Sequence, residues 1–305
     1  ELSAPYYSVI RNCLAYNNIH PTSPGNTDGI GGGGYRVTFE NNVAFGNSDD
    51  GMDGGGIEAT IKNNIVFNHY GEGNGAGIKF SVGGGGRHTV AGNVVFNNKG
   101  PSFEGSDPGT KRMEYYPSRI YGNLAYNGGY GFSLGTSYNL TYPGFEKVYL
   151  RDNIGLDNGI DIHSVNHLEA SFIDSDYNFF SQSDRLTTLQ NKGIDLHSLT
   201  GDPQLANKEV VIDTNFDPAW TIEEKLEHIR NQVREAFTPL NGSILIDAGI
   251  IIDGYHNPNP GDNAGEGKAW YGMAPDIGAY EYTLLPLAVI QNEPKQGYAP
   301  LTVSF

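Results

Sequence analysis

A short pattern recurs along the first part of this chain: asparagine, an aliphatic residue, a small residue, an aromatic residue and often a second asparagine. Its first asparagines are Asn12, Asn42, Asn64, Asn93, Asn123, Asn153 and, weakly, Asn178, at spacings of 30, 22, 29, 30, 30 and 25 residues. A unit of that length cannot bury its own apolar face, so neighbouring units must stack into a continuous core. With two or three short strands per turn and Gly or Asn at corners that need positive φ, the period predicts an all-β right-handed parallel β-helix. We interpret the asparagines as turn residues whose amides hydrogen-bond along the solenoid.

Composition narrows the possible partners. A formal net charge of −16 argues against nucleic acid, which needs a basic stripe. The single cysteine, Cys13, excludes internal disulfides. The sequence contains no run of about 18 apolar residues, so we expect no membrane span. The repeat is already under way at the first residues, and we therefore expect a longer parent protein.

Three regions are predicted along the chain. Residues 1–182 form the β-helix coils that carry the active site. Residues 183–285 form further coils and a cap with one α-helix at about 221–237, begun by a capping box of Thr221 and Glu224, after which strand-like sequence resumes at 243–249. Since a solenoid needs a cap over its last open edge, we expect this helix to serve packing rather than chemistry. Residues 286–305 form a linker and a stretch that resembles the first strand of a PKD-type immunoglobulin-like module, here truncated.

Three segments share a second pattern: Asp28-Gly29-Ile30-Gly31, Asp50-Gly51-Met52-Asp53 and Ala76-Gly77-Ile78-Lys79. If they are strands at the same place on successive coils, their aliphatic residues point inward and the flanking residues stack in outward columns. One column then contains Asp28 and Asp50, and the other contains Asp53 and Lys79. Adjacent strands lie roughly 4.8 Å apart, so these side chains and Asp49 converge on a patch the size of a metal site. We expect the strand column to continue through residues 101–104, 130–133 and 158–161.

The aspartates favour calcium. This cation takes six to eight oxygen ligands at about 2.3–2.6 Å. Asp28, Asp49, Asp50 and Asp53 offer only oxygen, with no His or Cys among them, which favours calcium over zinc. A solvated acidic surface turn is the alternative, although carboxylates this close repel strongly without a cation.

Lys79 has two interpretations. It is either a surface lysine paired with Asp53 or a catalytic base. A dication bound beside it would disfavour its protonated form and lower its pKa, and a neutral lysine can abstract a carbon-bound proton. If a uronic acid carboxylate binds the calcium, loss of the C5 proton and then of the C4 glycosidic oxygen completes a β-elimination.

Four stretches match the motifs of a known enzyme family: Thr27-Asp28-Gly29-Ile30, residues 47–53, Gly73-Asn74-Gly75 with Ile78-Lys79, and residues 87–98. They resemble polysaccharide lyase family 9, the pectate lyases built on a parallel β-helix. The resemblance implies that Asp28, Asp49, Asp50 and Asp53 bind a catalytic calcium and that Lys79 is the base. It is specific over about residues 8–100. Two departures stand out: Ala76 interrupts the usual Gly-Asn-Gly-aromatic-Lys order, and residues 100–104 read Gly-Pro-Ser-Phe-Glu where the family has Gly-Phe-Asp.

Two other functions remain open. A polygalacturonase-like inverting hydrolase would use Asn26-Thr27-Asp28 and the pair Asp49-Asp50, but it leaves Asp53 and Lys79 without roles. A non-catalytic, calcium-stabilised glycan-binding β-helix would keep Lys79 protonated and ion-paired.

The expected substrate is an acidic polysaccharide, either homogalacturonan or the rhamnogalacturonan backbone. Basic residues next to the metal are expected to bind its carboxylates, and the candidates are Arg87, His88, Lys99 and Arg112. His88 is equally a turn residue. A substrate of this kind, together with the truncated module, predicts a monomeric, secreted or cell-surface bacterial protein with several modules.

Overall fold

The structure, a computed structural model, describes residues 7–22, 25, 27–54, 56–71, 75–80, 88–105, 118–134, 147–163, 168–259 and 267–283. The predicted strand of a PKD-type module, and residues Asn26, Arg87 and Arg112, lie outside these ranges.

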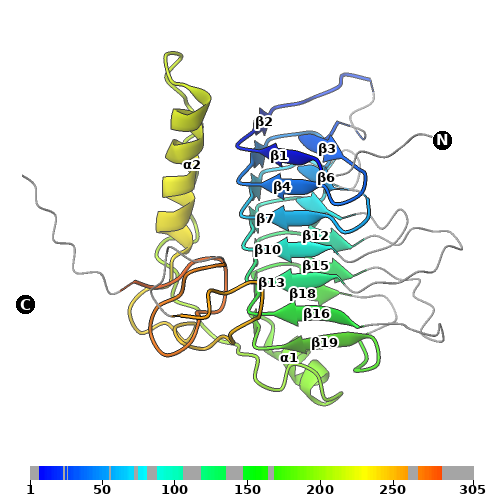
Figure 1. The fold of residues 1–305 in the computed structure, drawn as a ribbon, viewed down its shortest axis with the longest axis vertical. Helices are drawn as coiled ribbons and strands as arrows, with labels where there is room; N and C mark the ends of the chain where they lie inside the picture. Colours follow the sequence, from blue (N-terminus) through cyan, green and yellow to red (C-terminus); the bar gives the residue numbers. More distant parts are fainter. Residues whose placement is uncertain are drawn as a thin grey trace, which may run out of the picture.

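Short strands of this part of the chain stack into three parallel sheets that wind as a solenoid (Figure 1). The first sheet contains β1 (Val9–Arg11), β4 (Thr38–Glu40), β7 (Thr60–Lys62), β10 (Thr89–Ala91), β13 (Arg119–Tyr121), β16 (Val148–Arg151) and β19 (Ile173–Asp176). The second sheet contains β2 (Leu14–Tyr16), β5 (Val43–Phe45), β8 (Ile65–Phe67), β11 (Val94–Phe96), β14 (Leu124–Tyr126), β17 (Ile154–Leu156) and β20 (Phe179–Phe180). The third sheet contains β3 (Ile30–Gly32), β6 (Met52–Gly54), β9 (Ile78–Lys79), β12 (Pro101–Gly105), β15 (Tyr130–Leu134) and β18 (Ile160–His163). The fold is the predicted right-handed parallel β-helix.

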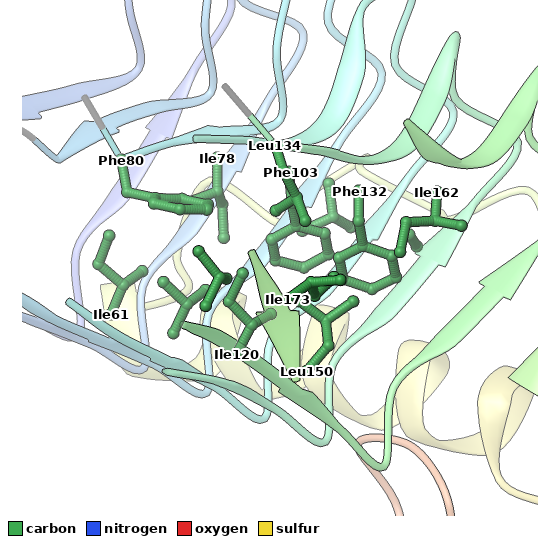
Figure 2. Packing of buried hydrophobic residues seen from close by; sticks show 14 of the residues in the cluster. Ile61, Ile78, Phe80, Phe103, Ile120, Phe132, Leu134, Leu150, Ile162 and Ile173 are labelled. Atoms are coloured by element: carbon green, nitrogen blue, oxygen red, sulfur yellow. The ribbon is translucent and has the colours of Figure 1, made fainter. Parts of the chain in front are cut away.

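The main core fills the inside of the solenoid (Figure 2). Equivalent residues of successive coils lie on one another, so the rings of Phe103 and Phe132 stack with centroids 5.0 Å apart. Each fully buried side chain of this size contributes roughly 1.5–3 kcal/mol. Stacking thus supplies the core that no single coil could form.

A ladder of buried asparagine amides runs along one corner of the solenoid. The side-chain amide of each donates to the side-chain oxygen of the next coil's asparagine at 2.9–3.1 Å, through Asn42, Asn64, Asn93, Asn123, Asn153 and Asn178. The first coil differs from the prediction. Cys13, not Asn12, occupies the ladder position, because Leu14 pairs with Val43. Asn12 instead takes the left-handed corner conformation, with φ 53°.

The helix α2 (Ile222–Phe237) begins with the predicted capping box of Thr221 and Glu224. It does not close the end of the solenoid. It lies along the outer face of the second sheet, where its apolar residues bury the outward side chains of that sheet (Figure 1). Phe237, for example, packs on Phe96 with ring centroids 5.1 Å apart.

A second helix, α1 (Ser183–Gln190), was not predicted from the sequence, which indicated a single helix. Leu186 and Leu189 of α1 complete the interior core beside β20, so α1 is the element that covers the end of the solenoid. It is short, contains two adjacent threonines and lacks a side-chain cap at Gln182. These features weaken the sequence pattern from which a helix is normally predicted. Neither helix has the length and apolar character needed to cross a bilayer.

Beyond β20 the described residues add no further strand to the three sheets, although an isolated parallel bridge between Phe179 and Leu199 continues the second sheet. Residues 243–249 form turns rather than a strand, and the later chain makes only isolated bridges. These residues cover the outside of the β-helix instead of extending it (Figure 1).

Candidate active site

The outward columns of the third sheet have the predicted register at their start. Met52 pairs with Ile78, and Asp53 therefore lies beside Lys79 on the neighbouring strand. The backbone N–H of Gly29 donates to the carbonyl oxygen of Asp50, which places Asp28 next to Asp50. Residues 26 and 22 positions apart in the sequence thus meet on one face of the sheet.

Later in the same sheet the register departs from the prediction. Phe132 pairs with Ile162, so the inward position belongs to Ile162 and not to Ile160. The outward neighbour is then His163, not Asp161. Asp161 is buried and accepts hydrogen bonds from Asn158 and Ser181, which explains why the similar-looking motif at 158–161 does not take the strand position.

Three carboxylates gather at the start of this face. One oxygen each from Asp28, Asp49 and Asp50 lies within 4.8 Å of the others. Asp49 and Asp50 are buried, with relative exposures of 7% and 1%. An all-oxygen donor set this compact fits a hard divalent cation such as calcium. Asp53, the fourth predicted ligand, is not a member of this group.

The protein alone opposes full ionisation of the cluster. Burial raises the pKa of Asp50 to about 7, even though Lys79 acts in the opposite direction. Burial and the charges of Asp49 and Asp53 likewise raise the pKa of Asp28. Carboxylates held in this way gain from a cation that neutralises them.

Lys79 lies between two carboxylates. Its Nζ is 3.1 Å from Oδ2 of Asp50 and 3.2 Å from Oδ2 of Asp53, and its side chain is 24% exposed. Burial acts to lower the pKa of Lys79, but the two carboxylates outweigh it and raise that pKa. With protein groups alone, Lys79 is therefore a protonated, ion-paired lysine, and the lowered pKa expected of a base requires that these carboxylates be neutralised.

Glycine is required behind the cluster. A Cβ atom at Gly51 would clash with Val66 and with the carbonyl oxygen of Gly77 on the next coil. The absent side chain lets the turn that carries Asp49 and Asp50 pack directly on the inner strands.

The predicted substrate-binding residues that the structure describes, Lys99 and His88, lie in different parts of the coil. Lys99 is exposed in the turn before β12, where its Nζ lies 3.4 Å from the carbonyl oxygen of Gly71. His88 is fully buried next to β10 of the first sheet, and its Nδ1 accepts a hydrogen bond from the N–H of Ala59. Burial lowers the pKa of His88 to about 4. The predicted contact of His88 with substrate is therefore wrong, because the side chain faces the interior.

Two residues near the site were not singled out from the sequence. Glu104 pairs with Lys79 on the far side from Asp53, so the lysine has a carboxylate residue on both neighbouring strands. His69 is buried behind the acidic turn, and its Nδ1 accepts from the N–H of Asn47 at 3.2 Å. Glu104 already lies in the column predicted through residues 101–104. His69 follows Asn68 and takes the position that Asn47 and Asn98 occupy on the neighbouring coils, so comparing the coils would have found it.

No protein-family model matches this sequence, and no curated protein is significantly similar to it. Among solved structures, the crystal structure of pectate lyase Pel9A is similar, with a TM-score of 0.50 and 21% sequence identity. The match covers 91% of this chain and 60% of the other. The likeness establishes the fold. This chain thus spans less than two thirds of the length of that pectate lyase.

Proposed function

We propose that this protein is a calcium-dependent polysaccharide lyase that cleaves a uronic-acid-containing polymer by β-elimination. The observation that carries the proposal is the placement of Lys79 within 3.2 Å of Asp50 and Asp53, directly beside a compact group of three carboxylates. The motif resemblance to polysaccharide lyase family 9 and the pectate lyase-like fold support it.

Asp28, Asp49 and Asp50 would hold the ion, and Asp53 is the proposed fourth ligand because its charge already acts on Asp28. A calcium ion bound there would neutralise the carboxylates that keep Lys79 protonated and would accept the substrate carboxylate.

Neutral Lys79 then takes the C5 proton of the uronate at Nζ. The electrons of the C5–H bond form the C4–C5 double bond, and the C4–O bond breaks. The leaving sugar oxygen takes up a proton from water, and Lys79 returns its proton to the solvent, so the products are an unsaturated uronide and a new chain end. No water attacks the sugar, in contrast to hydrolysis. The substrate is an extracellular polymer, so the proposed site of action is outside the cell.

An inverting hydrolase fits the geometry less well. That mechanism leaves a water between two carboxyl groups roughly 6.5–9.5 Å apart. The three carboxylates offer oxygens within 4.8 Å of one another, which suits a shared cation better than an acid and base pair.

The deciding experiment follows the ultraviolet absorbance of the unsaturated uronide on polygalacturonate and on rhamnogalacturonan, each with calcium and with a chelator. A calcium-dependent rise is expected on one of the polymers. New reducing ends without that absorbance would mean hydrolysis, and silence on both polymers would favour a glycan-binding module.

A further inference from the structure

A second group of side chains lies farther along the outer face of the third sheet. Successive pairing of Lys79 with Glu104, Glu104 with Ser133 and Ser133 with His163 forms one outward column. His163 is thus three strand spacings from Lys79, roughly 14 Å along the solenoid. Tyr130 begins the strand that contains Ser133, and it is partly exposed.

An aromatic pair marks this end of the face. The rings of Tyr130 and His163 stack with centroids 4.6 Å apart and an interplanar angle of 30°. Both side chains are partly exposed. Nδ1 of His163 is buried and has no hydrogen-bond partner among the described residues.

The end helix brings a guanidinium to the same place. Arg185 of α1 donates from Nε to the carbonyl oxygen of Ile162 at 3.1 Å, directly beside His163. Burial, followed by the charge of Arg185, lowers the pKa of His163, in keeping with a neutral ring next to the guanidinium.

Arg185 lacks an anionic partner in the described part of the chain. None of the ion pairs formed there includes it, and burial lowers the pKa of its guanidinium. A half-buried cation without a carboxylate is costly, and it is unexpected in a chain with a net charge of −16. An anion supplied from outside the protein would complete its contacts.

We propose that Tyr130, His163 and Arg185 form a distal subsite for an acidic sugar of the polymer strand that is cleaved at Lys79. The inference rests on the proposed lyase function. The stacked rings offer an apolar face to the C–H side of a sugar, and the guanidinium can bind a uronate carboxylate through two hydrogen bonds. The outward columns run along the solenoid. One extended polymer strand can therefore contact both Lys79 and the distal subsite.

The test uses oligomers of increasing length, from dimer to hexamer, made from whichever of polygalacturonate and rhamnogalacturonan the wild-type protein eliminates. In the wild type, KM should fall about tenfold once the oligomer is long enough to contact both Lys79 and Arg185, the size of effect expected from a charge-assisted hydrogen bond. Arg185→Ala should lose this gain with kcat nearly unchanged, and Arg185→Lys should recover part of it.

Two further variants separate binding from folding. Tyr130→Ala lies outside α1 and should lose the same gain. The matched control is Arg119→Ala, which removes an exposed arginine from β13 of the first sheet and should keep the gain. If the wild type shows no dependence of KM on length, or if Arg185→Ala and Tyr130→Ala both retain it, the subsite is overturned while the lyase function stands. If the wild type eliminates neither polymer, the proposed function is wrong and the subsite falls with it.

Discussion

The outer faces of the second and third sheets are built from the same coils, but they have different roles. The second sheet presents stacked aromatic rings, among them Phe45, Phe67 and Phe96, with neighbouring centroids 5.0 and 4.9 Å apart, and α2 covers them. The third sheet presents Asp53, Lys79 and Glu104 at equivalent outward positions. One face contributes stability through burial, and the other gathers charges that the fold alone does not neutralise. One side of the solenoid can therefore hold charged groups suited to chemistry, because apolar burial on another side stabilises the fold.

The largest effect is expected on the charged face. Lys79→Ala should lower the elimination rate by about 10²–10⁴-fold, the usual contribution of a general base, while the chain still folds. Lys62→Ala is the matched control, because Lys62 also forms a carboxylate pair but lies on the first sheet. Steady-state rates and thermal unfolding check both variants. A Lys79→Ala protein that keeps its activity would remove the base from the mechanism.

The covered face should respond in the opposite way. Phe67→Ala, at a fully buried ring, should lower the free energy of unfolding by about 3–5 kcal/mol. The folded fraction should retain its elimination rate, because the ring lies on another sheet from Lys79. Denaturant titration and rate measurements at low temperature test this. An equal loss of rate per folded molecule would show that the two faces are coupled.

Calcium should raise the free energy of unfolding only by binding to the carboxylates on the third sheet. At a calcium concentration of one hundred times Kd, binding to the native state adds about 2.7 kcal/mol to the free energy of unfolding. Asp50→Asn should abolish this gain, whereas Asp152→Asn, at a buried carboxylate away from the site, should retain it. Thermal unfolding with calcium and with a chelator distinguishes the two variants. Stabilisation of Asp50→Asn to the wild-type extent would place the ion elsewhere.

The buried carboxylate of Asp152 should also make the stability of the fold depend on pH. Burial raises the pKa of Asp152 to about 8, and its Oδ1 accepts from the N–H of Ile250. The pKa of Asp152 is higher in the folded state than in the unfolded state. Its contribution to stability is therefore complete below about pH 4 and is lost as the pH rises to about 8. Over that range the free energy of unfolding falls by no more than about 1.4 kcal/mol per pH unit. Asp152→Asn mimics the neutral form and should flatten that part of the stability profile. A profile as steep as the wild type's would assign the slope to other groups.

Much of the fold could be predicted because a β-solenoid repeats one local rule. Alternation along a strand sets which residues point inward, and the repeat spacing brings equivalent residues of successive coils together. Asp53 beside Lys79 follows from those two facts alone. The same rule fails where the pattern is ambiguous by one or two residues, as at Cys13 and Ile162. There, the pairing that buries the apolar side chains overrides the resemblance of the motif.

The sequence by itself determined the class of fold, the acidic columns and the existence of α2, because all three depend on periodicity and local capping. Only the tertiary structure decided which sheet α2 covers, that α1 closes the end, that His88 faces inward and that Arg185 meets His163. These outcomes depend on how segments far apart in sequence return to bury particular apolar faces. No local sequence pattern specifies which face is buried, since an amphipathic helix packs equally well on any apolar surface of matching shape.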